Sequence, residues 1–165
     1  MQFAKDSFYI ALRDRLAALN PSRTVVVDGV MRPAVLAAEN EPATAAAPLP
    51  NAFYLHWGAA QVVQGTESAR RPLLKVECGI AYRVPGVQAG AVDRGRALSA
   101  LDCELLRLCT PPRTPKCDYA HTPLVALGST VFWGEPEFGA AESAHHELRR
   151  TARLLVFFFP EVDQA

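Results

Sequence analysis

The sequence predicts an α+β domain in which two helices pack on one face of a mainly antiparallel sheet. Two segments repeat apolar residues at helical spacing, over about 5–19 and 92–108. The remaining segments hold β-branched or alternating runs, so the order is helix, strands, helix, strands, with no internal repeat. At 165 residues the chain has the length of one domain, and we expect a single domain over 1–165.

The first helix is predicted from Lys5 to Leu19. Asp6 or Ser7 is expected to cap its start, and Asn20-Pro21 ends it. Its apolar stripe follows spacings of four, four and three residues: Phe8, Leu12, Leu16 and Leu19.

A short strand and a loop are expected next. The β-branched run Thr24–Val27 ends at the turn pair Asp28-Gly29. Residues from Met31 to Glu39 favour a second strand. The segment 37–50 is rich in alanine and proline without periodicity, so we interpret it as an extended arm or loop that contacts a neighbouring molecule.

A hairpin is predicted around a polar turn at Gln64–Ser68. Its first strand is the aromatic run Phe53–Trp57, and its second is Leu73–Val84. The second strand alternates, and one face carries Leu74, Val76, Cys78, Ile80, Tyr82 and Val84.

The second helix is predicted from Val92 to Leu108, and Pro111-Pro112 follows it. Because residues 110–128 carry several prolines, we expect an irregular, proline-rich loop there. The helix presents one stripe of leucines: Leu98, Leu101, Leu105 and Leu108.

Two strands complete the predicted sheet. Thr130–Trp133 is the first, Glu135–Glu142 is a turn or loop, and Glu147–Phe159 is the last strand. Since Leu154–Phe159 is apolar on both faces, we expect this strand to be central and covered on both sides.

Composition excludes several functions. The 17 basic and 17 acidic residues balance, whereas nucleic-acid and anionic-membrane binding need a cationic excess. We therefore expect no membrane and no direct sequence-specific nucleic-acid binding. No run approaches the roughly 18 apolar residues of a membrane span. The start, Met1 to Asp6, has no signal-peptide pattern, so the chain reads as cytosolic.

Two groups of residues raise the possibility of a bound ligand or metal. The loop Gly86–Gly90 lies between strand and helix, but it lacks the Lys-Ser/Thr of a phosphate loop, so we interpret it as a turn. Zinc or a Cys109–Cys117 disulfide stays open, although the spacing is unlike zinc knuckles. A zinc site would use Cys109, Cys117 and His121, with Cys103 as the fourth ligand. We expect free thiols at all four cysteines, Cys78 included.

No catalytic constellation is visible, and we predict neither an enzyme nor a cofactor. In His145-His146-Glu147, adjacent strand residues point to opposite faces, so the histidines do not converge. Asp102 and Glu104 lie about 200° apart on a helix. A different reading remains open, namely a small ligand-binding or enzymatic domain with a pocket lined by Tyr82, Trp57 or His56.

Charged clusters are candidate subunit contacts, although solvated sheet ends are the plainer interpretation. The basic members are Arg70, Arg71, Arg149, Arg150 and Arg153, and acidic counterparts are Glu135 and Glu137, together with Glu142. A head-to-tail ring would bring such groups of neighbouring subunits together.

The order of elements resembles the tail terminator and tail-completion proteins of long-tailed bacteriophages. The resemblance runs from about Lys5 to Phe159: an amphipathic helix ending in Asn-Pro, a valine-rich strand, an arm, the Leu73–Val84 hairpin, a crossing helix from Asp93 to Leu108, and two final strands. The 110–128 loop is longer than the family pattern.

The resemblance implies a structural virion protein without enzymatic activity. Such subunits form a ring, usually a homohexamer, that caps the tail tube, ends tube growth and joins the tail to the head-side neck. The implied partners are other copies of the chain, the tail tube protein and a neck or connector protein. The implied location is the virion tail or neck, with assembly in the host cytoplasm. Another neck, connector or head–tail joining subunit is the alternative.

Overall fold

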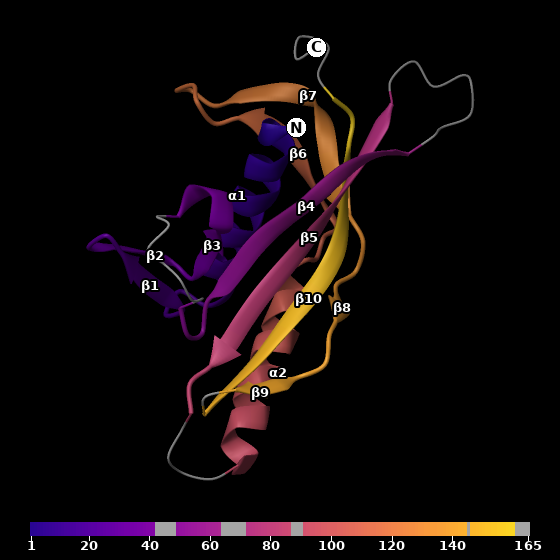
Figure 1. Ribbon diagram of the computed structural model, residues 1–165. Helices are drawn as coiled ribbons and strands as arrows, with labels where there is room; N and C mark the ends of the chain where they lie inside the picture. Colours follow the sequence, from indigo (N-terminus) through magenta and orange to yellow (C-terminus); the bar gives the residue numbers. More distant parts are fainter. Residues whose placement is uncertain (42–48, 64–71, 87–90, 145, 161–165) are drawn as a thin grey trace.

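The computed structural model describes residues 1–41, 49–63, 72–86, 91–144 and 146–160. Two long helices lie on one side of a large, mostly antiparallel sheet, which confirms the α+β class (Figure 1). The main sheet has the strand order β3-β4-β5-β10-β7-β6, with β8 and β9 also paired to β10. A separate two-stranded ribbon, β1-β2, stands beside it.

The helices are α1 (Gln2–Leu19) and α2 (Ala91–Leu108), with a single 3-10 turn η1 (Ala38–Asn40). The strands are β1 (Thr24–Val27), β2 (Val30–Pro33), β3 (Val35–Ala37), β4 (Phe53–Val63), β5 (Leu73–Val84), β6 (Arg113–Asp118), β7 (Val125–Trp133), β8 (Glu137–Phe138), β9 (Glu142–Ala144) and β10 (Glu147–Phe158).

Helix α1 begins three residues earlier than predicted, and neither Asp6 nor Ser7 caps it. Ser7 lies inside the helix, where its hydroxyl donates to the carbonyl of Phe3 at 2.7 Å and accepts from the backbone N–H of Cys117 at 2.9 Å. The residue therefore ties α1 to β6. Leu19, predicted to end the apolar stripe, is exposed.

The Asp28-Gly29 turn forms as predicted. Val27 pairs with Val30 across it, and both turn residues have positive φ, at 51° and 78°. These angles suit a two-residue turn whose twist matches the strands. The predicted strand from Met31 to Glu39 is divided into β2 and β3.

The predicted hairpin of β4 and β5 is confirmed, and β5 also pairs with β10 over eleven residues from Leu148 to Phe158. The alternation of β5 decides its faces. Val76, Ile80 and Tyr82 are buried beneath the helices, while Glu77 between them is exposed. We call the helix-covered side the inner face and the opposite side the outer face.

The prediction of an irregular loop over 110–128 is wrong, because this segment contains β6 and the start of β7. Pro115 does not prevent the strand. β6 is the last strand of the sheet order, and the register shifts between Pro115 and Cys117. An edge strand at a register irregularity tolerates a residue that has no N–H to donate. The predicted loop over Glu135–Glu142 likewise contains β8.

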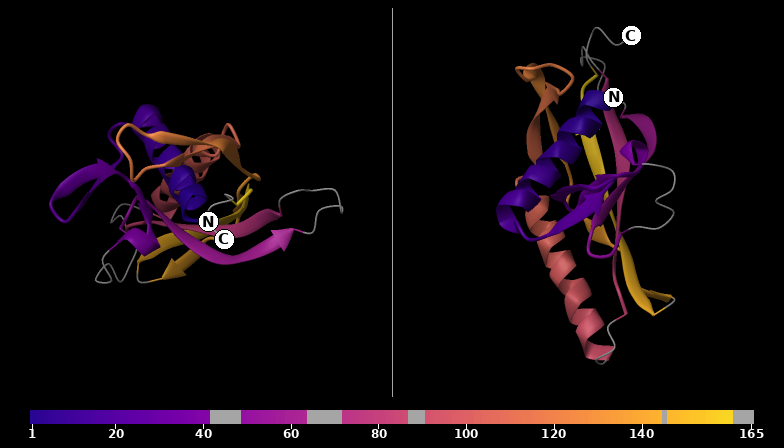
Figure 2. Two further views of the ribbon diagram at one scale, coloured as in Figure 1. Left: turned by 90° about the horizontal axis from the view of Figure 1, so that it is seen from above. Right: turned by 90° about the vertical axis from the view of Figure 1, so that its left-hand side faces the viewer.

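The last strand is central, as predicted, but it is covered on one face only. Leu154, Val156 and Phe158 are buried on the inner face. Leu155 on the outer face keeps 39% of its surface exposed, and Phe157 is partly exposed. Both helices lie on the inner side, so neither helix covers the apolar residues of the outer face (Figure 2).

The helices are held to the sheet by a continuous apolar core. Helix α1 contacts β3 near one edge and β6 at the other, so the sheet curls around it (Figure 2). Helix α2 lies against β5 and β10 through the four predicted leucines, all buried. Each such leucine contributes about 1.5–3 kcal/mol.

Of the predicted 37–50 arm, Ala37 ends β3 and Ala38–Asn40 form η1. Other predicted features fall outside the described residues: residues 42–48 of the arm, the Gln64–Ser68 turn, Arg70, Arg71, most of the Gly86–Gly90 loop, and His145. Within the described part of the chain, neither long helix is apolar enough over 18 residues to cross a membrane.

Candidate interaction surface

A groove lies on the outer face where the chain leaves β7 and returns as β8. Trp133 pairs with Val156 and Phe138 pairs with Ala152, so the segment between them departs from the edge of β10. Only the Gly134 N–H to Leu155 carbonyl bond, at 3.0 Å, spans this stretch. This outer groove encloses about 790 Å³ and is lined by Glu77, Gly134, Glu135, Pro136, Glu137, Arg153, Leu154, Leu155 and Phe157.

The apolar part of the outer groove continues into a pair of stacked aromatic rings. Phe157 of β10 and Phe132 of β7 pair across the strands, with ring centroids 5.4 Å apart and planes 9° apart. Leu155 lies two residues along the same face. These side chains form an apolar strip on a sheet face that no helix covers.

The charged part of the outer groove has an acidic excess. Arg153 lies opposite Glu137 in the pairing of β10 with β8, and its Nε is 3.8 Å from the carboxylate of Glu77. Among the described residues, neither Glu135 nor Glu137 forms an ion pair. Three carboxylates and one guanidinium therefore line the outer groove.

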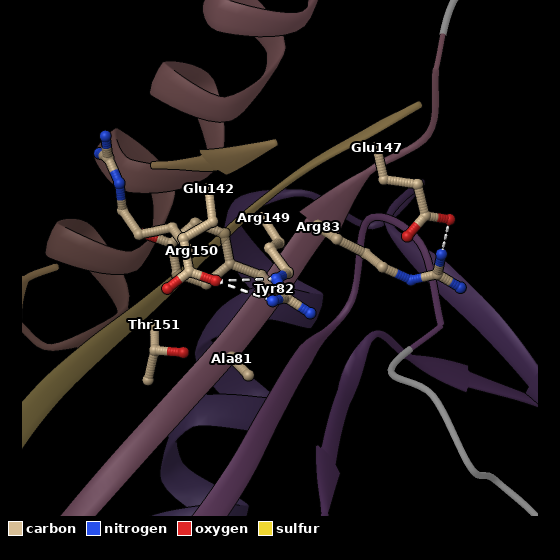
Figure 3. Close-up of a pocket in the computed structure, with 8 residues that line it drawn as sticks. All are labelled: Ala81, Tyr82, Arg83, Glu142, Glu147, Arg149, Arg150 and Thr151. Atoms are coloured by element: carbon tan, nitrogen blue, oxygen red, sulfur yellow. Dashed lines mark hydrogen bonds and ion pairs between the residues drawn. The ribbon is translucent and has the colours of Figure 1, made fainter. Parts of the chain in front are cut away.

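The two other described arginines among the predicted contacts already have partners in their own chain. Arg149 binds Glu142 at 2.9 Å, beside a second ion pair of Arg83 with Glu147 (Figure 3). These pairs line a smaller cavity of about 380 Å³ at the start of β10. The structure thus gives intramolecular roles to side chains that the sequence offered as intermolecular contacts.

Arg150 points to the inner face and joins β10 to α2. Its guanidinium pairs with Asp102, which also accepts a hydrogen bond of 2.5 Å from the hydroxyl of Tyr82. Burial, reinforced by the bond to Asp102, raises the pKa of Tyr82 far above its usual value. Asp102 and Arg150 are therefore a structural pair that orients α2 on the sheet.

A third notable surface is the β1-β2 ribbon, which projects from the β3 side of the molecule (Figure 1). Val26 and Met31 face each other across it and are 59% and 69% exposed. Val30 is 62% exposed. A two-stranded ribbon is marginally stable by itself, and this one presents apolar residues to water.

The cysteines do not gather into a metal or disulfide site. All four are free thiols, and no cluster of three or more His, Cys, Asp or Glu occurs in the described ranges. Nδ1 of His121 lies 2.9 Å from Oδ2 of Asp118. Burial raises the pKa of Cys78 well above its usual value and that of Cys109 to about 12. These two thiols are therefore poor nucleophiles at neutral pH.

The residues of the ligand-binding alternative do not share one face. Trp57 packs edge-on against Phe8, with centroids 5.6 Å apart, and Tyr82 is buried under α2. His56 is exposed on the outer face beside Tyr54. We find no arrangement of these three side chains around a common cavity in the described residues.

Arg15 of α1 was not identified from the sequence, because nothing in its spacing along the helix distinguishes it from an ordinary surface residue. Its guanidinium donates to the carbonyls of Leu108 and Pro111, each at 2.8 Å, and of Arg113 at 3.0 Å. It therefore satisfies the C-terminal end of α2, where carbonyls lack helical partners. Burial lowers the pKa of Arg15, and the group lies over the ring of Trp133 at 5.1 Å.

Comparison with known proteins gives similarities to solved structures. No protein-family model matches the sequence, and no curated protein matches it. A chain in a solved structure described as the virion of a native gene transfer agent particle superposes with a TM-score of 0.42 and 17% sequence identity. The match covers 94% of each chain.

Proposed function

We propose that this chain is a structural virion subunit that assembles with copies of itself and caps the end of a phage-type tail tube. The observation that carries the assembly part is the apolar surface left open on two sides of the chain. One side is the strip of Leu155, Phe157 and Phe132; the other is the exposed pair of Val26 and Met31. Apolar surface that is open in one subunit is buried when subunits associate.

The terminator role rests on the order of elements described from the sequence. Helix α1, the valine-rich strand β1, the β4–β5 hairpin, helix α2 and the later strands follow one another as in the resemblance described from the sequence. A ring of such subunits would end tube growth and present its other surface to the neck. A neck or connector subunit would use the same open surfaces without binding the tube end.

The test is to measure mass by light scattering for the chain alone and with a purified phage tail tube protein. A ring-sized species, or tubes that stop lengthening when the chain is added, supports the proposal. A chain that stays monomeric and does not bind tubes contradicts the proposal. A rise in melting temperature with small molecules would then favour the ligand-binding class. Binding to a connector ring, with no effect on tubes, would favour the neck alternative.

A further inference from the structure

We propose that the outer groove receives helix α2 of a second copy of this chain, with Arg96 and Arg107 of that helix meeting the groove carboxylates. This inference rests on the proposed assembly function, and it names the two surfaces that meet. It follows from three features: the outer face of β10 that neither helix covers, the complementary charges of the groove and of α2, and the geometry of α2.

The first feature is the uncovered outer face of β10. A sheet face that carries Leu155 and Phe157 gains stability when another layer excludes water from it. On the inner face, that layer is α2 itself. A second copy of α2 on the outer face would place the central strand between two helices, the arrangement that its two-sided apolar sequence is typical of.

The second feature is complementary charge. Glu135 and Glu137 are exposed carboxylates without an ion pair in the described residues. Arg96 and Arg107 are exposed guanidiniums, and they too lack an ion pair in the part of the chain that the structure describes. The arginines of β10 are committed within their own chain, so α2 is the better source of cations for a neighbour's groove.

The third feature is the geometry of α2. Arg96, Ala100, Cys103 and Arg107 are exposed and follow one another at spacings of four, three and four residues. They form a single stripe, opposite the buried leucines. The two arginines are about 16 Å apart along the axis at 1.5 Å per residue.

The carboxylates of the outer groove stand on both of its rims. Glu77 lies on β5 and Glu137 on β8, with β10 between them. Two strand spacings separate these rims by about 10 Å. A helix laid across the strands would place one arginine beyond each rim, and each side chain would reach inward to a carboxylate.

The positions of α2 and the outer groove also determine the symmetry of the contact. Helix α2 lies on the inner side of the sheet (Figure 2), whereas the outer groove is lined by outer-face residues of β10, among them Arg153 and Leu155. Each copy therefore offers one helix and one groove to different neighbours. Such a heterologous contact propagates head to tail and closes into a ring when its rotation permits.

Charge reversal tests the proposal in the full chain. One variant carries Glu77→Lys, Glu135→Lys and Glu137→Lys, and the other carries Arg96→Glu and Arg107→Glu. Each alone is expected to need an about 100-fold higher concentration for half-assembly, because like charges meet. Mixed in equal amounts, the two variants restore both contacts in alternation and should assemble like the unmodified chain. Circular dichroism and urea unfolding verify that each variant folds, and Arg13→Glu, at a partly exposed position of α1, is the matched control.

The native thiol Cys103 supplies an independent measurement. It is exposed in the single chain and lies between the two arginines, so iodoacetamide should label it several-fold more slowly once assembly occurs. This measurement needs no groove substitution and remains valid if a charge-reversed variant fails to fold.

The outcomes separate this inference from the proposed function. If the unmodified chain never assembles, alone or with tube protein, both fail. If it assembles but the reversed variants behave like the control, or Cys103 stays equally reactive, the helix-in-groove contact is wrong while the ring function stands. If the groove variant loses tube binding yet still self-associates, the groove belongs to the tube protein and the inference is overturned.

Discussion

The ring of Phe132 lies parallel to the ring of Phe157, with 5.4 Å between centroids, on the sheet face that neither helix covers. Such a pair stabilises the joint between β7 and β10 and at the same time remains available to a neighbour. The following predictions separate these two roles and test the contacts that hold the helices in place.

Removing either stacked ring should cost modest stability. Phe132→Leu and Phe157→Leu are each expected to lower the free energy of unfolding by about 1 kcal/mol, because the stacking contribution is lost while an apolar side chain remains. Urea denaturation of both single variants and the double variant gives the coupling between the rings. A coupling energy near zero would show that the parallel rings do not stabilise each other.

Arg15→Met should destabilise the chain by about 2 kcal/mol. The substitution keeps an apolar stem but removes the charged donor from the carbonyl of Leu108 at the end of α2 and from those of Pro111 and Arg113 beyond it. The control is Arg13→Met on the same helix, which removes an exposed pair with Asp14 and a contact with the ring of Tyr9, and should change stability by less than about 0.5 kcal/mol. Equal losses in both variants would contradict the assigned role of Arg15.

The stability of the fold should decrease at alkaline pH. The pKa of Cys109 is raised to about 12 by burial, so the native state favours the protonated thiol. The corresponding stability is fully present below the unfolded pKa, near 8.5–9, and is lost as pH rises toward 12. Each such thiol should contribute a slope of about 1.4 kcal/mol per pH unit in that window.

The contribution of Cys109 to this alkaline loss can be isolated. Cys109→Ala should flatten the dependence of the urea midpoint on pH between 9 and 11. Val131→Ala is the control, because it removes buried apolar volume without removing a thiol. A Cys109→Ala chain with the unmodified pH dependence would rule out this thiol as a source of the loss.

The β1-β2 ribbon should matter for assembly and little for the isolated chain. Val26→Thr combined with Met31→Gln keeps strand-compatible side chains at exposed positions, so the free energy of unfolding should change by less than about 0.5 kcal/mol. The assembled fraction, measured by sedimentation with tube protein present, should fall. Thr24→Ser, on the same face of β1, is the control. Unchanged assembly would remove the ribbon from the interface.

Patterns confined to one segment were readable in the sequence. The alternation of Leu73–Val84 determined which side of β5 is buried, and the leucine spacing of 98–108 determined the inner face of α2. The pair Asp28-Gly29 determined a tight turn because its positive φ angles need no tertiary support. These features depend on local geometry and on the period of apolar residues.

Other features were decided only when distant segments met. Pro115 indicated a loop, but an edge position made a strand permissible there. Leu155 and Phe157 indicated a strand covered on both sides, but both helices pack on the inner face. Within the single chain, Arg150 pairs with Asp102 of α2, whereas the sequence suggested that it would meet a carboxylate of a neighbouring subunit.

The physical reason is that periodicity reports how apolar a face is, whereas topology decides what covers that face. The sequence by itself determined two helices, an antiparallel sheet and a central last strand. Only the tertiary structure decided that neither helix covers one side of that strand, with three carboxylates beside it and with Arg96 and Arg107, which form no ion pair in the described residues, on the helix behind the sheet. An open apolar face of this kind is typical of surfaces that bind other proteins.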